Sequence, residues 1–199
     1  MADIEASVAA DLIATAHALA DAARVATLSY FRTPDLAAET KETHRFDPVT
    51  AADRLSEERM RAILAERRPD DGILGEEFGP KAGTSGLTWV LDPIDGTRGY
   101  LSGTPTWGVL ISVADASGPI YGIIDQPYIG ERFEGGLGRC HVTGPMGVQF
   151  LKTRTPRKLD QAILFTTFPE VGTPEEGAAF RRVVPNVRLV RYGTDCYAY

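Results

Sequence analysis

Two aspartates at the end of an apolar run are the residues of this chain best suited to chemistry. Residues 89–97 have the sequence W-V-L-D-P-I-D-G-T, so a predicted strand leads directly into Asp92 and Asp95. Pro93 restricts Asp92 to an extended conformation, and Gly96 lets a ligand approach the backbone closely. A helix that begins near Gly96 would offer free N–H groups to an anion. Since Mg²⁺ commonly binds one or two carboxylates together with a substrate phosphate, this segment predicts a site for both.

Further acidic residues precede this segment at two places. Glu76 and Glu77 directly follow a short predicted strand that ends at Gly75, which suits a metal ligand and a residue that supports it. Asp47 comes before a predicted helix and Asp53 lies in its first turns, where the helix dipole favours an acid. Both places are candidates for additional functional carboxylates.

Each of these pieces also has a purely structural interpretation. Asp-Pro and Asp-Gly are common turn dipeptides, an adjacent pair of glutamates is usually a solvated surface pair, and Asp53 alone would be an ordinary helix cap. The compound D-P-I-D-G-T string favours function, because a strand does not need that sequence in order to turn.

The elements that would position these acids are helices followed by short strands. Apolar residues recur at spacings of three and four along residues 3–31, and a second apolar face follows at 50–68, so we expect two helices. Short apolar runs then predict strands at 73–75, 89–91, 107–114 and 120–125, a meander over 131–148, a strand at 162–166, a helix at 174–184 and a strand at 187–192. Helices, then antiparallel strands, then a strand–helix–strand unit predict a layered mixed α/β architecture.

The composition shifts near residue 150, which predicts two domains. We expect an N-terminal α+β metal-binding domain over residues 1–150 and the start of a C-terminal α/β domain over residues 151–199. Residues 193–195 predict a strand-to-helix turn, and residues 196–199 would be the first turn of that helix. Because a single helical turn is not stable alone, the chain is expected to stop within an element and its C-terminal part to be incomplete.

The overall composition is that of an ordinary globular protein. Of 199 residues, 43% are apolar and 24% charged, which excludes global disorder. The formal net charge of −6 argues against nucleic acid as a partner, and no apolar run approaches the ~18 residues of a membrane span. Cys140 and Cys196 make no disulfide framework, so we expect a reduced, cytoplasmic protein. His17, His44 and His141 lack metal-ligand spacing and are expected to be structural or surface residues.

Three ordered motifs resemble those of the inositol monophosphatase family of metal-dependent phosphatases. They are D-P-I-D-G-T at residues 92–97, G-E-E at 75–77 and D-x-V-T-x-x-D at 47–53. The resemblance covers essentially the whole chain. It implies an α+β layered sandwich (α-β-α-β-α, sugar-phosphatase-like), two or three Mg²⁺ ions as cofactors, and a homodimer in the full-length form.

The resemblance also implies a set of metal ligands. Glu76, Asp92 and the carbonyl of Ile94 would hold the first Mg²⁺, and Asp92 would bridge to a second ion that Asp95 also holds. Glu76 would lie nearest a third, weaker ion and is counted among the catalytic residues. Two such ions clamp the attacking and leaving oxygens of an in-line displacement at phosphorus.

The remaining carried-over roles concern water and phosphate. Asp53 and Thr97 look like the pair that orients and deprotonates the attacking water. The backbone N–H groups of Gly96 and Thr97 look like phosphate ligands, and Glu77 resembles a neighbouring acid that supports the site. The implied activity is therefore a Mg²⁺-dependent phosphomonoesterase that acts on a small phosphorylated metabolite.

One branch of the family is favoured by the residues after these motifs. Arg98 follows D-G-T, and residues 102–108 fit the pattern S-G-x-P-x-x-G, which is similar to the histidinol-phosphatase branch. Asp195 would then pair with the amine of histidinol phosphate, an intermediate of histidine biosynthesis. Asp195 also fits an ordinary acid at a helix N-terminus. Inositol monophosphatase and a phosphoadenosine phosphatase are alternative activities.

The chain departs from the family pattern in one respect. The family extends beyond this point and supplies a W-D motif whose aspartate completes the second metal site. Trp89 and Trp107 are the only tryptophans, and neither precedes an aspartate. The second ion would keep only Asp92 and Asp95, so a non-catalytic metal-binding fragment is the alternative to an enzyme.

Overall fold

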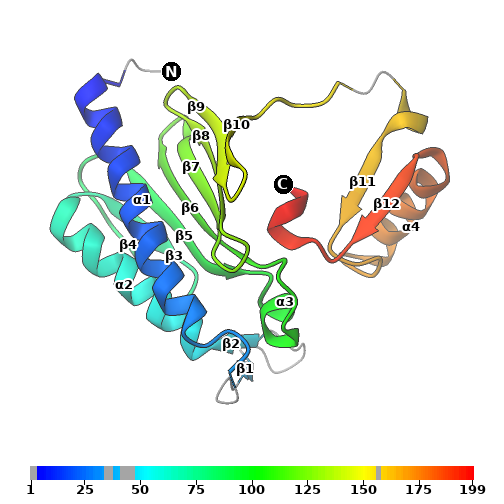
Figure 1. Cartoon of the computed structure of the whole chain (residues 1–199), viewed down its shortest axis with the longest axis horizontal. Helices are drawn as coiled ribbons and strands as arrows, with labels where there is room; N and C mark the ends of the chain where they lie inside the picture. The colour runs from blue at the N-terminus through cyan, green and yellow to red at the C-terminus, as the bar shows by residue number, and fades with distance from the viewer. Residues whose placement is uncertain (1–3, 34–37, 41–47, 156–157) are drawn as a thin grey trace. The chain divides into compact units, whose positions relative to one another are not determined.

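The computed structural model describes residues 4–33, 38–40, 48–155 and 158–199. The chain divides into two compact units, Met1–Leu151 and Lys152–Tyr199. His44 and Asp47, two of the residues named above, lie outside the described residues. Figure 1 shows the elements of both units along the chain.

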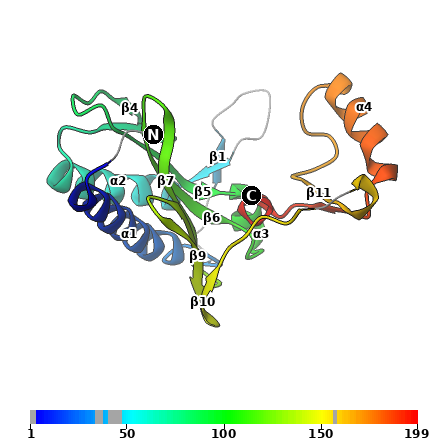
Figure 2. The same cartoon turned by 90° about the horizontal axis from the view of Figure 1, so that it is seen from above.

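Two helices open the first unit, as predicted. Helix α1 (Ala6–Leu28) buries Leu12, Ala16 and Leu19, the residues that recur at spacings of three and four. Helix α2 (Ala51–Arg67) is preceded by a short antiparallel pair of strands, β1 (Ala38–Thr40) and β2 (Pro48–Thr50). Both helices lie on the same face of one large sheet (Figures 1 and 2).

That sheet has eight strands in the order β10-β9-β8-β7-β6-β5-β3-β4. Their bounds are β3 Gly72–Gly75, β4 Gly79–Lys81, β5 Thr88–Asp95, β6 Gly108–Asp115, β7 Gly118–Gln126, β8 Glu131–Gly136, β9 Arg139–Gly144 and β10 Gly147–Phe150. The predicted strands are confirmed, and β5 is longer than expected because it continues through both aspartates.

The expectation of antiparallel strands was wrong for one pair, since β3 and β5 run parallel. Strand β4 forms a hairpin on the outer side of β3, and the chain then returns to pair β5 with the inner side. The carboxyl ends of β3 and β5 therefore lie at the same edge, with Gly75 opposite Leu91. This pairing positions the acids that follow both strands.

Two apolar clusters hold the first unit together. The larger joins α1 and α2 to the sheet and includes Leu19, Met60, Trp89 and Ile111. The smaller comprises Phe31, Ala52, Ile94, Tyr100 and Trp107. In it Tyr100, on the short helix α3 (Thr97–Ser102), donates a hydrogen bond of 2.7 Å from its hydroxyl to the carbonyl of Thr27. The end of α1 is thereby tied to the segment that follows the aspartates.

The second unit is a small parallel strand–helix–strand arrangement. Strands β11 (Ile163–Thr166) and β12 (Leu189–Tyr192) pair in parallel, and helix α4 (Pro174–Val183) connects them. Short 3₁₀ segments lie at Leu159–Gln161, Val184–Asn186 and Asp195–Ala198. Across the described residues, no helix is both long enough and apolar enough to span a membrane.

Candidate active site

The parallel pairing of β3 and β5 brings Glu76 to Asp92. The amide of Glu76 donates a hydrogen bond of 3.3 Å to the carbonyl of Leu91, so Glu76 continues the β3–β5 ladder beside Asp92. The side chains of Glu76 and Asp92 are hydrogen-bonded to each other. Two of the predicted metal ligands from separate strands therefore lie together.

Strand β5 continues from Asp92 to Asp95 through a bulge. The pairing of β5 with β6 shifts register between Asp92 and Asp95, which is typical of a strand that redirects its side chains near a site. Gly96 then adopts a left-handed conformation (φ 82°), which glycine takes without steric cost. Thr97 begins α3, and its hydroxyl donates a hydrogen bond of 3.1 Å to the carbonyl of Ile94. The predicted helix start at Gly96 is confirmed.

Asp53 is a buried residue at the start of α2. Its Oδ2 accepts hydrogen bonds from the amide (2.8 Å) and the hydroxyl (2.6 Å) of Thr50, which forms a capping box. The cap explains why an acid stands in the first turn. Its charge also raises the pKa of Asp92, so Asp53 lies near the same group of acids.

The electrostatics of this group are unfavourable without a cation. Burial, which is the largest cause, and the negative charges of Glu76, Asp95 and Asp53 together raise the pKa of Asp92 to about 8. Asp92 Oδ1 is buried and has no hydrogen-bond partner. Such an oxygen is costly to bury unless a cation or a donor pairs with it.

These residues fit a hard divalent cation in their donor chemistry and charge. Carboxylate and carbonyl oxygens are the ligands that Mg²⁺ prefers, and a cation would relieve the repulsion that holds Asp92 protonated. Among the residues that the structure describes, no three acidic, histidine or cysteine side chains already have the arrangement of a closed metal site. The fit therefore rests on the carboxylate and carbonyl donors of the site and on the unpartnered Oδ1 of Asp92. It does not rest on a preformed coordination shell.

We expect the metal-free protein to lose stability as the pH rises. The pKa of Asp92 is raised from 3.8 to about 8 by folding, so the folded state holds the extra proton between these values. Its stabilising effect is fully present below about pH 4 and is lost as the pH rises through about 8. Urea unfolding in the presence of a chelator, near pH 5 and near pH 8, measures this change.

The variant Asp92→Asn isolates the contribution of this carboxyl from those of all other titrating groups. The unfolding free energy of the wild type should fall relative to that of the variant as the pH rises. A difference that stays constant over this range would contradict the assignment.

Glu77 and Asp195, two further predicted site residues, lie outside the strand and helix that carry Asp92 and Asp53. Glu77 follows Glu76 in the turn after β3. Asp195 belongs to the second unit, where it begins the last 3₁₀ segment with a positive φ of 43°. The predicted strand-to-helix turn is present there. The role of Asp195 toward a substrate stays a prediction.

Sequence reasoning missed one buried acid close to this site. Glu57 lies one helical turn after Asp53 on α2, is fully buried, and contacts the turn that carries Glu77. A charged residue in the middle of a helix is normally solvent-exposed. The available signal was its spacing of four from both Asp53 and Arg61.

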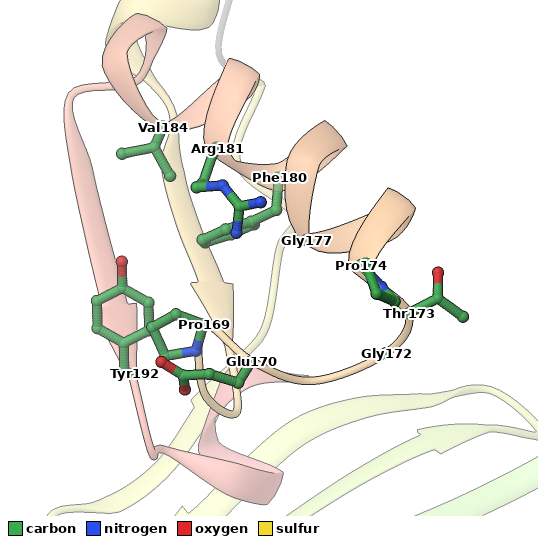
Figure 3. Close-up of a pocket in the computed structure, with 10 residues that line it drawn as sticks. All are labelled: Pro169, Glu170, Gly172, Thr173, Pro174, Gly177, Phe180, Arg181, Val184 and Tyr192. Carbon is green, nitrogen blue, oxygen red and sulfur yellow. The ribbon is translucent and has the colours of Figure 1, made fainter.

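A separate cavity of about 580 Å³ lies in the second unit, between α4 and β12. Figure 3 shows Phe180 and Arg181 on α4 and Tyr192 on β12 among the residues around it. The rings of Phe180 and Tyr192 meet edge to face with their centroids 6.4 Å apart. None of the predicted site residues lines this cavity, so it is not the candidate active site.

Comparison with known proteins defines the class to which this fold and these acids belong. The model of the inositol monophosphatase family matches residues 9–199. The chain therefore belongs to the inositol monophosphatase family.

The curated relatives of this chain include a protein named bifunctional phosphatase and proteins named histidinol-phosphatase. The bifunctional phosphatase IMPL2 of Arabidopsis thaliana is 39% identical over 188 residues, which cover 94% of this chain and 53% of the relative. The histidinol-phosphatase of Streptomyces coelicolor is 43% identical over 127 residues, 62% of this chain and 47% of the relative. This chain thus spans about half the length of these curated relatives.

A solved structure of an inositol monophosphatase from Zymomonas mobilis shares the fold. It is 38% identical, has a TM-score of 0.79, and is matched over 98% of this chain and 72% of its own. The predicted family and the layered α/β fold are confirmed.

Proposed function

We propose that this chain carries the active site of a Mg²⁺-dependent phosphomonoesterase whose substrate is histidinol phosphate. The observation that carries the proposal is the group of acids at the shared edge of β3 and β5, in which Asp92 has a pKa of about 8 and a buried oxygen without a partner. Such strong perturbation by burial and like charges is typical of functional sites. Membership of a family of phosphatases gives the reaction class.

Each residue of the site has a part in the proposed reaction. Glu76, Asp92, Asp95 and the carbonyl of Ile94 hold two or three Mg²⁺ ions. When bound, these ions polarise the phosphate oxygens and make water a nucleophile at neutral pH. The amides of Gly96 and Thr97 bind the phosphate, as amides at a turn into a helix do. Glu77 supports the arrangement from the same turn as Glu76.

Proton transfer falls to Asp53 and Thr97. The Thr97 hydroxyl donates to the carbonyl of Ile94, which holds its side chain beside the metal-binding segment. In the proposed step Thr97 and Asp53 orient the water and take its proton as it attacks phosphorus. The phosphorus–oxygen ester bond breaks and inorganic phosphate remains. The leaving alkoxide takes up a proton from solvent water, and the proton taken by Asp53 and Thr97 returns to solvent, so that one water is consumed in all.

The substrate is proposed from the residues that follow the metal-binding segment. Two relatives at 40% identity or more are named histidinol-phosphatase. Asp195 would pair with the amine of histidinol phosphate, and inositol phosphates offer no such cation. Inositol 1-phosphate is the second candidate, because a relative from Mycobacterium leprae that is 36% identical is named inositol-1-monophosphatase.

The oligomeric state, location and partners of the enzyme are also part of the proposal. We infer a homodimer for the full-length protein and a cytoplasmic location with no nucleic acid or membrane as partner. Both cysteines are free, which suits a reducing compartment. A metal-binding fragment without turnover is the alternative function for a chain that spans half of its relatives.

A comparison of substrates tests the proposal. The purified 199-residue chain is offered histidinol phosphate and inositol 1-phosphate at the same concentration with saturating Mg²⁺, and phosphate release is measured. We expect a higher kcat/KM for histidinol phosphate, and we expect Asp195→Asn to reduce that preference by about 10-fold. A preference for inositol 1-phosphate would contradict the substrate, although not the reaction class.

A further inference from the structure

A buried carboxylate on α2 accepts hydrogen bonds from the turn that carries Glu76 and Glu77. Glu57 Oε2 accepts a hydrogen bond of 2.7 Å from the amide of Glu77, and its Oε1 accepts one of 3.2 Å from the amide of Phe78. The side chain of Glu57 is fully buried. Two consecutive amides after a proposed metal ligand therefore depend on one side chain from another element.

Arg61 completes this contact. Its Nε donates a hydrogen bond of 2.7 Å to Glu57 Oε1, and its Nη2 donates to the carbonyl of Gly79. Its guanidinium lies 5.9 Å from the centre of the Phe78 ring. The charge of Glu57 is thus compensated, and the turn over residues 77–79 is fixed through both its amides and a carbonyl.

Gly75 provides the space for this carboxylate. A Cβ atom at residue 75 would lie 1.9 Å from Glu57 Oε1, 2.4 Å from its Cδ and 2.7 Å from Arg61 Nη2. The glycine of the G-E-E motif is therefore required here by close approach, because the buried Glu57–Arg61 pair packs directly on the backbone of β3.

We propose that Glu57 is a positioning residue for the metal site: it fixes the backbone after Glu76 and thereby sets the place of the Glu76 carboxylate beside Asp92. This inference rests on the proposed function, since it assigns Glu76 to Mg²⁺. Helix α2 then serves the site twice, because Asp53 and Glu57 lie one turn apart on its buried face. Partners that orient a ligand typically change metal affinity by about 10–100-fold when they are removed.

The variant Glu57→Gln tests the proposal, since it keeps the shape of the side chain but replaces one acceptor oxygen by a donor. We expect Mg²⁺ affinity measured by calorimetry to fall about 10–100-fold, with a matching rise in the Mg²⁺ concentration for half-maximal phosphate release. The KM for substrate at saturating Mg²⁺ should change little. Hydrogen exchange at the amides of Glu77 and Phe78 should become faster. Glu58→Gln, at the exposed neighbouring position, is the control that should change none of these.

Two further variants keep the test decisive. Gly75→Ala should produce the same loss of Mg²⁺ affinity by displacing the same carboxylate, and its effect should not add to that of Glu57→Gln. Arg61→Lys is a milder change, because it keeps the positive charge beside Glu57. It tests the positioning role if the other variants do not fold. It should weaken Mg²⁺ binding in the same direction.

The outcomes separate the two proposals. Folded variants that bind Mg²⁺ like the wild type, with reduced thermal stability alone, would overturn the positioning role. A wild-type chain that binds Mg²⁺ but releases no phosphate would overturn the proposed enzyme, while the calorimetry still decides on Glu57. A wild-type chain that binds no Mg²⁺ would overturn both.

Discussion

The Asp92→Asn variant is expected to lose Mg²⁺ binding and phosphate release while becoming more stable than the wild type in the absence of metal. Asp92 would hold Mg²⁺ in the proposed site, so its loss should reduce phosphate release at a fixed Mg²⁺ concentration by at least the ~10–100-fold that follows removal of a residue supporting a metal ligand. The neutral amide removes an ionisable group that burial and the charges of Glu76 and Asp95 keep protonated up to about pH 8. The stability gain should therefore be largest above this pH.

Calorimetry, phosphate release and thermal unfolding with a chelator measure the two effects separately. Asp70→Asn is a suitable control, because Asp70 is an exposed acid in the turn after α2. It should leave metal binding and stability unchanged. Asp92 would not be a metal ligand if Asp92→Asn bound Mg²⁺ as the wild type does, and its raised pKa would be contradicted if the variant destabilised the metal-free protein at alkaline pH.

The second large effect is expected at Asp125 of β7, two strands away from β5, in an ion-pair network that contains none of the proposed site residues. Asp125 is fully buried on β7. Its Oδ1 accepts hydrogen bonds of 2.7 Å from Arg24 of α1 and 2.7 Å from Arg132 of β8, and Arg24 also donates to Oδ2 at 3.2 Å. This one carboxylate joins α1 to two neighbouring strands.

Asp125→Asn should cost about 3–5 kcal/mol of unfolding free energy, because it leaves two guanidinium groups without their buried counter-charge. Urea unfolding measures the loss. Asp21→Asn is the matched comparison, since Asp21 also accepts from Arg132 (2.8 Å) but its side chain is 71% exposed. That variant should cost less than about 1 kcal/mol. Equal losses of unfolding free energy for both variants would show that burial does not determine how much each ion pair stabilises the fold.

The helices and most strands were predictable because local patterns determine them. Leu12, Ala16 and Leu19 define the buried face of α1, and the Thr50–Asp53 capping box fixes the start of α2. The ordered acids of the three motifs pointed to the family before any geometry was known. These signals need only residues that are close in sequence or order along the chain.

The features that were missed depend on contacts between distant residues. The parallel β3–β5 pair arises because β4 takes the outer side of β3, and no local pattern encodes that choice. A glutamate within a helix is normally solvated, and the partners of Glu57 at Glu77 and Phe78 are about twenty positions away in the sequence. The extension of β5 through Asp95 likewise depends on pairing with β6.

Phosphate release from histidinol phosphate as a function of Mg²⁺ concentration tests the central claim most directly. The folded 199-residue chain should show a saturable rise in turnover with Mg²⁺, which a chelator and Asp92→Asn should both abolish. Turnover that persists with the chelator would contradict the metal site. A folded, Mg²⁺-bound chain that releases no phosphate at any concentration would contradict the enzyme and leave a metal-binding protein.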